Sequence, residues 1–170
     1  NFAQNNFIYI YLTTLDGKTL SNQVERYTLT GTTLSDRKVI VENIPGSTNH
    51  DGGRIAFGPD AMLYITTGDA GTPDNAQKTD SLAGKILRVQ EDGSIPSDNP
   101  FKNAVYSYGH RNIQGLTWDT DGQLWATEHG RSGRVSGYDE INKIVKGSNY
   151  GWPFIQGDEV RRGMISPYLH

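Results

Sequence analysis

A repeated apolar hairpin is the feature that most constrains the fold of this chain. Residues 55–66 and residues 116–127 align without a gap at an offset of 61 positions, with apolar residues matched throughout. A fainter third copy begins at Ile8, 55 positions before Leu63. A unit of roughly 40 to 60 residues that recurs in this way is typical of the blade of a β-propeller. Each copy is followed by a second apolar element with a basic residue near its end, namely Arg26, Arg88 and Lys143.

Glycine and turn residues also favour an all-β fold. The chain has 20 glycines in 170 residues, well above the usual share of about 7%. Asp-Gly pairs at 16–17, 92–93 and 121–122 lie between apolar runs. They predict three hairpin turns, because both central positions of a type I′ turn need a positive φ.

The length of the chain sets the number of blades. It accommodates about three units, with approximate borders at residues 1–48, 49–109 and 110–170. Closed propellers have roughly four to eight blades, and three blades would leave two sheet edges exposed. We therefore expect about half of a ring, completed by the remainder of a longer protein or by a second chain.

Composition excludes several classes of function. Sixteen basic and 19 acidic residues give a net charge of −3, which argues against a nucleic-acid partner, since such a protein needs a basic face. The absence of cysteine excludes disulfides, thiolate metal sites and a cysteine nucleophile. No apolar run approaches the roughly 20 residues of a membrane span. A nicotinamide cofactor is not expected either, because no nucleotide-binding glycine motif follows a strand.

A first polar cluster lies just before the second hairpin. His50 stands near two glycines, so that a planar ligand can approach it closely, and histidine serves as a general base near neutral pH. Asp69 follows the same hairpin and is placed to accept a hydrogen bond from the imidazole, which would fix its tautomer. Taken singly, each residue is more typical of an ordinary turn.

A second polar cluster lies just before the third hairpin. It contains Arg111, Asn112 and Gln114, and Arg111 follows His50 by 61 positions. The repeat predicts that both clusters emerge at the same end of the ring, near its axis. Guanidinium and amide donors suit an anionic, carbonyl-rich ligand. Ordinary hydrogen bonding between loops is the alternative.

A third segment carries oxygen ligands of the kind that calcium prefers. Main-chain carbonyls at Gly130 and the carboxylate of Glu140 are hard donors. Their spacing does not match an EF-hand loop, so that charged residues on a surface loop remain an alternative.

Together, these motifs resemble the glucose/sorbosone dehydrogenase family, whose members are soluble aldose sugar dehydrogenases that use pyrroloquinoline quinone (PQQ). The resemblance runs from about residue 7 to residue 167. The matching motifs stand in the family's order at residues 50–60, 63–69, 82–88, 98–101, 108–112, 114–116 and 149–153.

The resemblance implies a six-bladed propeller that binds PQQ over its axis and oxidises aldose sugars to lactones. It implies that His50 takes the proton of the anomeric hydroxyl, that Asp69 orients His50, and that Arg111 lies near the reacting carbonyl of the quinone. It further implies that His50, Arg111, Asn112 and Gln114 contact the cofactor.

The resemblance also implies two calcium ions. Main-chain oxygens of Gly130 and Arg131 would bind the calcium beside the cofactor, and Glu140 and Tyr150 would help to hold a second, structural calcium. Arg131 stands where the family usually has proline, and a polar stretch at residues 132–138 follows it.

The same resemblance implies a periplasmic or extracellular location, an aldose sugar as substrate and an electron acceptor whose identity stays open. Two alternatives remain. One is a non-catalytic extracellular propeller that serves as an interaction module. The other is a calcium-dependent propeller lactonase, which would need several acidic and amide side chains around one metal, whereas the predicted axial clusters are basic and rich in amides.

Overall fold

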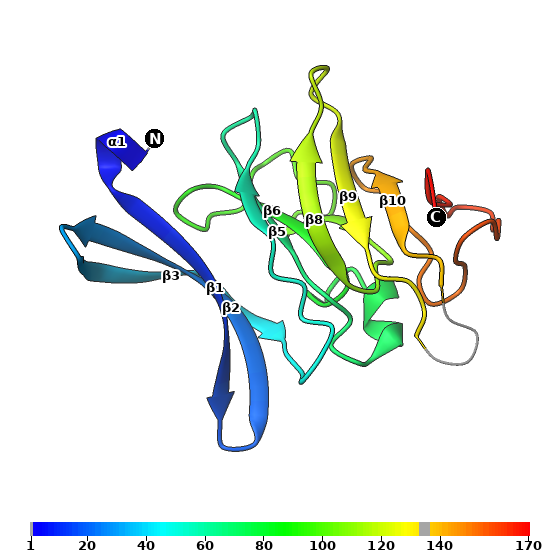
Figure 1. Ribbon diagram of the computed structural model, residues 1–170, viewed down its shortest axis with the longest axis horizontal. Coiled ribbons are helices and arrows are strands. Elements are labelled where there is room, and N and C mark those ends of the chain that lie inside the picture. The colour runs from blue at the N-terminus through cyan, green and yellow to red at the C-terminus, as the bar shows by residue number, and fades with distance from the viewer. Residues whose placement is uncertain (1, 133–136) are drawn as a thin grey trace.

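The computed structural model describes residues 2–132 and 137–170, and it contains three antiparallel sheets that follow one another across the molecule in chain order (Figure 1). Sheet 1 has the order β1-β2-β3, sheet 2 the order β4-β5-β6-β7, and sheet 3 the order β10-β9-β8. The predicted all-β architecture is confirmed. The elements are α1 (Phe2–Asn5), β1 (Phe7–Asp16), β2 (Thr19–Thr30), β3 (Thr33–Pro45), β4 (Ile55–Phe57), β5 (Leu63–Thr66), the 3-10 helix η1 (Pro73–Gln77), β6 (Lys85–Val89), β7 (Val105–Tyr108), β8 (Ile113–Trp118), β9 (Leu124–Glu128) and β10 (Glu140–Lys143).

The repeat found in the sequence corresponds to the same residue pairing between neighbouring strands in each of the three sheets. In each sheet, the aromatic residue at the corresponding position of β1, β5 or β9 is paired directly with the basic residue of the next strand. Directly opposed side chains in an antiparallel pair are close neighbours, so each aromatic ring lies beside a cationic stem. The three sheets are therefore equivalent units. The pairs are Tyr9 with Arg26, Tyr64 with Arg88, and Trp125 with Lys143.

Two apolar clusters fill the spaces between adjacent sheets. Successive residues of a strand point to opposite faces, and in β5 this places Leu63 and Ile65 in the cluster shared with sheet 1. Tyr64 points the other way, into the cluster shared with sheet 3. Because sheet 2 is covered on both faces, β5 and β6 are buried along their whole lengths.

Two of the three predicted hairpin turns are correct and one is wrong. The Asp-Gly pairs at 16–17 and 121–122 lie at the turns that connect β1 to β2 and β8 to β9. In both turns only the glycine has a positive φ, 60° at Gly17 and 78° at Gly122, so the hairpins are confirmed but the expected type I′ geometry is not. The pair at 92–93 follows β6, but the next strand begins only at Val105. The intervening segment folds around Arg88 instead: Asn99 Nδ2 donates to the Arg88 carbonyl over 2.8 Å, and Arg88 Nη1 donates to Asn99 Oδ1 over 2.9 Å.

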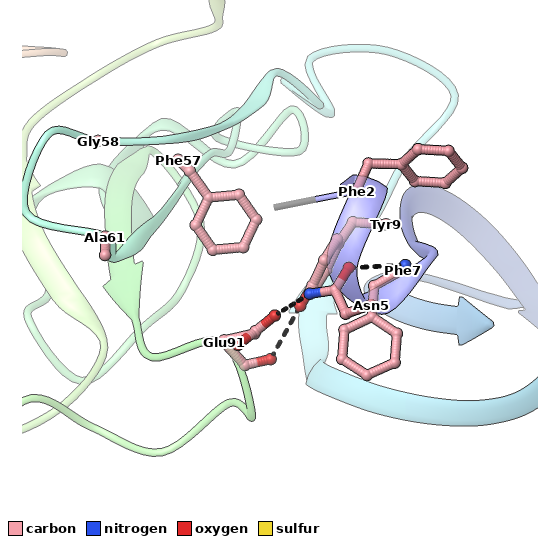
Figure 2. A pocket seen from close by; sticks show the side chains of 8 residues that line it. All are labelled: Phe2, Asn5, Phe7, Tyr9, Phe57, Gly58, Ala61 and Glu91. Atoms are coloured by element: carbon pink, nitrogen blue, oxygen red, sulfur yellow. Dashed lines mark hydrogen bonds between the residues drawn. The ribbon is translucent and has the colours of Figure 1, made fainter. Parts of the chain in front are cut away.

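A groove of about 430 Å³ lies between the N-terminal end of sheet 1 and sheet 2 (Figure 2). Asn5 Nδ2 donates to Glu91 Oε1 over 3.0 Å, and the Tyr9 hydroxyl donates to the Glu91 carbonyl over 3.3 Å. These bonds join sheet 1 to the loop that follows β6. None of the site residues predicted from the sequence lines this groove.

In the described part of the chain, no helix has the length and apolar character needed to cross a membrane.

Candidate functional site

The first two polar clusters meet at one end of sheets 2 and 3, as the repeat predicts. The Gly52 amide donates to Asn112 Oδ1 over 3.1 Å. Gly68, just beyond β5, forms an isolated antiparallel bridge with Asn112, and the Asp69 amide donates to the Arg111 carbonyl over 2.8 Å. Residues about 40 to 60 positions apart in the chain thus form one surface.

His50 and Asp69 form a hydrogen-bonded pair at the centre of this surface. His50 Nδ1 lies 2.8 Å from Asp69 Oδ1, with 22% of the histidine side chain and 1% of the aspartate side chain exposed. The Gly71 amide donates to the same carboxylate oxygen over 2.9 Å. A carboxylate beside Nδ1 favours the tautomer that carries its proton there, which leaves Nε2 as the basic nitrogen.

The loop that carries His50 is pressed against the end of β5. His50 has a φ of 58° and Gly52 a φ of 69°, both in the left-handed region that glycine adopts at little cost. A Cβ at Gly52 would lie 2.7 Å from the Thr66 carbonyl oxygen, so that only glycine fits there. The loop therefore has little freedom to move away from Asp69.

Sheet 1 holds the other side of this loop through Asp51. Asn22 Nδ2 donates to Asp51 Oδ1 over 2.8 Å, and the Ser47 amide donates to the same oxygen over 2.9 Å. The Tyr11 hydroxyl donates to the Asp51 carbonyl over 2.6 Å. Burial and the nearby Asp51 charge raise the pKa of Tyr11, so the phenol stays a donor. His50 is thus positioned by sheets 1 and 2 together.

The predicted cofactor-binding residues lie beside this pair. Arg111 Nη1 donates to the His129 carbonyl over 3.3 Å, and its Nη2 donates to Ser132 Oγ over 3.0 Å. Gln114 is exposed, and its Nε2 donates to Asn112 Oδ1 over 3.0 Å. Asn112 Oδ1 also accepts from the Gly52 amide. These two bonds fix Oδ1 toward Gly52 and Gln114, so that Asn112 Nδ2 points away from the loop that carries His50.

His50, Arg111 and Asn112 border an open depression of about 530 Å³. Among the described residues, two arginines and a single carboxylate contribute to its wall, so that it suits an anionic ligand. Gln114 lines a neighbouring hollow instead. The residues around the depression are His50, Arg111, Asn112, His129, Gly130, Arg131, Ser132, Gly137 and Asp139.

The turn predicted to bind the cofactor's calcium forms part of the same wall. Gly130 and Arg131 both line the depression. The Gly130 amide donates to Asp139 Oδ1 over 2.9 Å, and the Arg131 carbonyl accepts from the Gly137 amide over 3.2 Å. Of the polar stretch that follows Arg131, residues 133–136 lie outside the described residues.

Glu140 and Tyr150 border a separate, small cavity of about 10 Å³. Burial, and secondarily the charge of Glu128, raise the pKa of Glu140 to about 7. Gln156 lines the same cavity, and within the described structure its buried Oε1 has no hydrogen-bond partner. The carboxylates of Glu128 and Glu140 and the side-chain amide of Gln156 therefore line one small cavity.

Metal binding here would depend on main-chain and amide oxygens as well as carboxylates. Across residues 2–132 and 137–170, no group of three His, Cys, Asp or Glu side chains is placed to hold a metal ion. Calcium accepts six to eight oxygen ligands, carbonyls included, so carboxylates alone are not required.

Some residues of the site had no signal in the sequence patterns. Trp152 Nε1 donates to Asp69 Oδ2 over 2.8 Å, across 83 positions of the chain. Glu128 Oε2 lies 2.9 Å from Nδ1 of the fully buried His110. The family motif at residues 149–153 contains Trp152, but no local pattern in the sequence links Trp152 to Asp69.

Comparison with known proteins establishes the family. The family model for glucose / sorbosone dehydrogenase matches residues 1–168. The chain belongs to the glucose/sorbosone dehydrogenase family. Quinoprotein glucose dehydrogenase B of Acinetobacter calcoaceticus is 38% identical over 188 residues, which cover 92% of this chain and 38% of that protein.

Solved structures of this family have the same fold. An oxidoreductase of Thermus thermophilus, described as a glucose dehydrogenase, matches with a TM-score of 0.92 and 43% identity over 98% of this chain and 53% of its own. The PQQ-bound aldose sugar dehydrogenase of Streptomyces coelicolor matches with a TM-score of 0.90 and 40% identity over 98% and 49%. The chain thus spans about half, or less, of the length of these relatives. Its three sheets are part of a β-propeller.

Proposed function

We propose that this chain forms the catalytic part of a PQQ-dependent dehydrogenase that oxidises aldose sugars to lactones. The observation that carries the proposal is the His50–Asp69 pair, which lies at the rim of a depression bordered by Arg111 and Asn112. A quinoprotein glucose dehydrogenase and a PQQ-bound aldose sugar dehydrogenase among the relatives support the same chemistry.

In this proposal His50 is the general base. Its Nδ1 is bonded to Asp69, so that its Nε2 takes the proton of the anomeric hydroxyl as the C–O bond gains double-bond character. Asp69 stabilises the imidazolium that forms and keeps the ring in place. When bound, the quinone supplies the two-electron acceptor for the hydride that leaves the anomeric carbon.

Arg111 and Asn112 are proposed to hold the cofactor, with Gln114 supporting Asn112. PQQ carries three carboxylates, and a guanidinium offers paired donors at fixed geometry to such groups. The contacts of Arg111 with the His129 carbonyl and Ser132 orient its side chain at the edge of the depression. Arg131 adds a second positive charge to the same wall.

Calcium is proposed at two places. Carbonyls of Gly130 and Arg131 border the depression and are suitable ligands for a calcium beside the cofactor. Glu140, Tyr150 and Gln156 line the small cavity, and within the described structure Gln156 Oε1 has no hydrogen-bond partner. The cavity suits a structural ion because a buried amide oxygen without a donor is costly. Calcium in the depression would strengthen the binding of the anionic cofactor.

We propose a periplasmic or extracellular location for this activity and an aldose sugar as the substrate. Both follow from the family, whose named relatives include aldose sugar dehydrogenases. Electron transfer would continue to an acceptor outside this chain. The rest of the ring, from the same protein or from a second chain, would complete the wall of the depression.

The test is a titration of the full chain with PQQ, with and without calcium, followed by tryptophan fluorescence. Trp152 lies near the depression, so bound quinone should quench its emission. Saturable, calcium-dependent quenching near one equivalent, followed by dye reduction with aldoses, supports the dehydrogenase. Absence of both in a preparation that contains the complete ring would overturn it.

The same assay separates the alternatives. An interaction module would bind neither PQQ nor sugar, and His50→Ala would leave its partner binding unchanged. A calcium-dependent lactonase would hydrolyse lactones without PQQ. The basic wall of the depression favours an anionic cofactor over either alternative.

A further inference from the structure

The indole of Trp152 lies directly behind the proposed catalytic pair. Its Nε1 donates to Asp69 Oδ2 over 2.8 Å, while Asp69 Oδ1 faces His50 Nδ1. We propose that Trp152 is a positioning residue, which locks the Asp69 carboxylate and thereby keeps His50 in the tautomer needed for proton abstraction. The catalytic consequence rests on the proposed function, whereas the effect on His50 does not.

The Asp69 carboxylate depends on this bond because it is buried. With 1% of its side chain exposed, water contributes little to its solvation. Its Oδ1 accepts from His50 and from the Gly71 amide, and its Oδ2 accepts from Trp152. Without the indole N–H, Oδ2 would lose the one side-chain donor that it has among the described residues, and a buried acceptor left without a donor is costly. Rotation of the carboxylate toward other donors would then disturb its bond to His50.

Trp152 itself is held firmly by its main chain. Its amide donates to the Gly109 carbonyl over 2.9 Å, and its carbonyl accepts from Gln77 Nε2 over 2.5 Å. Gln77 is fixed in turn by Asn149, since Asn149 Nδ2 donates to Gln77 Oε1 over 2.8 Å and Gln77 Nε2 lies 3.1 Å from Asn149 Oδ1. The main chain that carries the indole is therefore fixed relative to Asp69.

The same indole contacts Arg111. The guanidinium carbon lies 5.4 Å from the centroid of the Trp152 ring, within the range of a cation–π interaction. Trp152 thus connects the proposed base pair with the arginine proposed to bind the cofactor. The role of the N–H and the role of the ring must be separated in any test.

Two variants separate these roles. Trp152→Phe removes the N–H and part of the ring, whereas Trp152→benzothienylalanine replaces the N–H by sulfur and keeps a bicyclic ring beside Arg111. Trp125→Phe is the matched control. Trp125 Nε1 donates to Asp119 Oδ2 over the same 2.8 Å, but on the surface of sheet 3 and away from the depression.

The first readout is the tautomer of His50, measured by ¹⁵N NMR on the full chain with labelled histidine and without cofactor. We expect the proton on Nδ1 in the wild type and in Trp125→Phe. A mixture of tautomers is expected in both Trp152 variants. If the Trp152 variants are folded and keep the wild-type tautomer, the proposal is wrong. If Trp152→Phe does not fold, the benzothienylalanine variant decides.

The second readout is steady-state kinetics of the PQQ-loaded, calcium-loaded protein with an aldose and a dye acceptor. Loss of a hydrogen-bond partner that orients a metal-binding histidine or carboxylate costs about 10- to 100-fold in affinity or activity, and we take the same range for a partner that orients a general base. We expect that loss in kcat for both Trp152 variants, with KM nearly unchanged, and no loss for Trp125→Phe. Unchanged kcat overturns the catalytic consequence. A wild type with the complete ring that oxidises no sugar overturns the proposed function, while the NMR result still decides the role of Trp152.

Discussion

A Cβ at Gly68 would lie 1.7 Å from the carbonyl oxygen of His50. The two backbones are therefore in direct contact, and no side chain fits between them. This contact places the His50 loop against the end of β5, where the Ala70 amide also donates to the His50 carbonyl over 3.1 Å. The position of the imidazole is thus set by a glycine 18 positions away.

Gly68→Ala should displace the His50 loop. Because the clash is with backbone rather than with a flexible side chain, we expect both a lower melting temperature and a loss of sugar oxidation of at least about tenfold. Gly17→Ala is the control, since that position has open space around it although its φ is positive. It should lower stability slightly and leave activity intact. Equal activity of the two variants would contradict the tight contact.

His50→Ala and Asp69→Asn should remove most activity without removing PQQ binding. General-base catalysis contributes about 10²- to 10⁴-fold, and we expect kcat to fall within this range for each variant. Because the two residues act as a unit, the double variant should be little worse than either single one. His170→Ala, which breaks another histidine–aspartate pair with a distance of 3.1 Å, is the control. Additive losses would show that the two residues act separately.

Arg111→Ala should weaken PQQ binding. A hydrogen bond to a charged group contributes about 1.5–3 kcal/mol, so we expect the dissociation constant to rise by at least about tenfold in fluorescence titrations. Arg161→Ala serves as control, because Arg161 lies 4.6 Å from the Phe154 ring centroid and does not line the depression. An unchanged PQQ affinity in Arg111→Ala would argue against the proposed cofactor contact.

Glu140 should make the stability of the metal-free protein depend on pH. Burial raises its pKa from 4.5 to about 7, so between these values the unfolded state releases a proton that the folded state retains. The free energy of unfolding should therefore fall as pH rises from about 4.5 to 7, by up to roughly 3 kcal/mol. Urea unfolding in a chelator would measure this fall, and Glu140→Gln should abolish it.

Glu42 is exposed, and the variant Glu42→Gln is the control for these unfolding measurements. Its stability should follow the wild-type curve, whereas that of Glu140→Gln should not. Added calcium at pH 8 should stabilise the wild type and Glu42→Gln, because the ion would compensate the charges around the small cavity. Stabilisation of Glu140→Gln to the same extent would place the calcium elsewhere.

Much of the fold could be predicted because it follows from local patterns. The offset of 61 positions between the second and third hairpins anticipates equivalent strand pairs, and the pairing of Tyr64 with Arg88 and of Trp125 with Lys143 bears this out. Alternating apolar residues and turns at glycine require only neighbouring residues to form. The same periodicity predicted that the two polar clusters meet, because equivalent loops of equivalent sheets emerge at the same end.

Local patterns did not reveal which residue at a turn makes which bond. Asp121 aligns with Asp60 in the repeat, and Asp60 Oδ2 accepts from the Tyr64 hydroxyl over 3.0 Å. In sheet 3 the corresponding bond, to Trp125 Nε1, is made by Asp119 instead. Similarly, the Asp-Gly pair at 92–93 has a hairpin sequence, but the partners of Arg88 direct the following segment elsewhere.

By itself, the sequence determined the repeat, the all-β class and the candidate chemistry of His50 and Asp69, because these depend on residue type and short-range spacing. Only the tertiary structure decided that Trp152 holds Asp69 and that Glu128 faces His110. Such bonds join side chains whose positions depend on how three sheets pack together. No spacing along the chain records that packing, since it is the sum of many apolar contacts, each of them small.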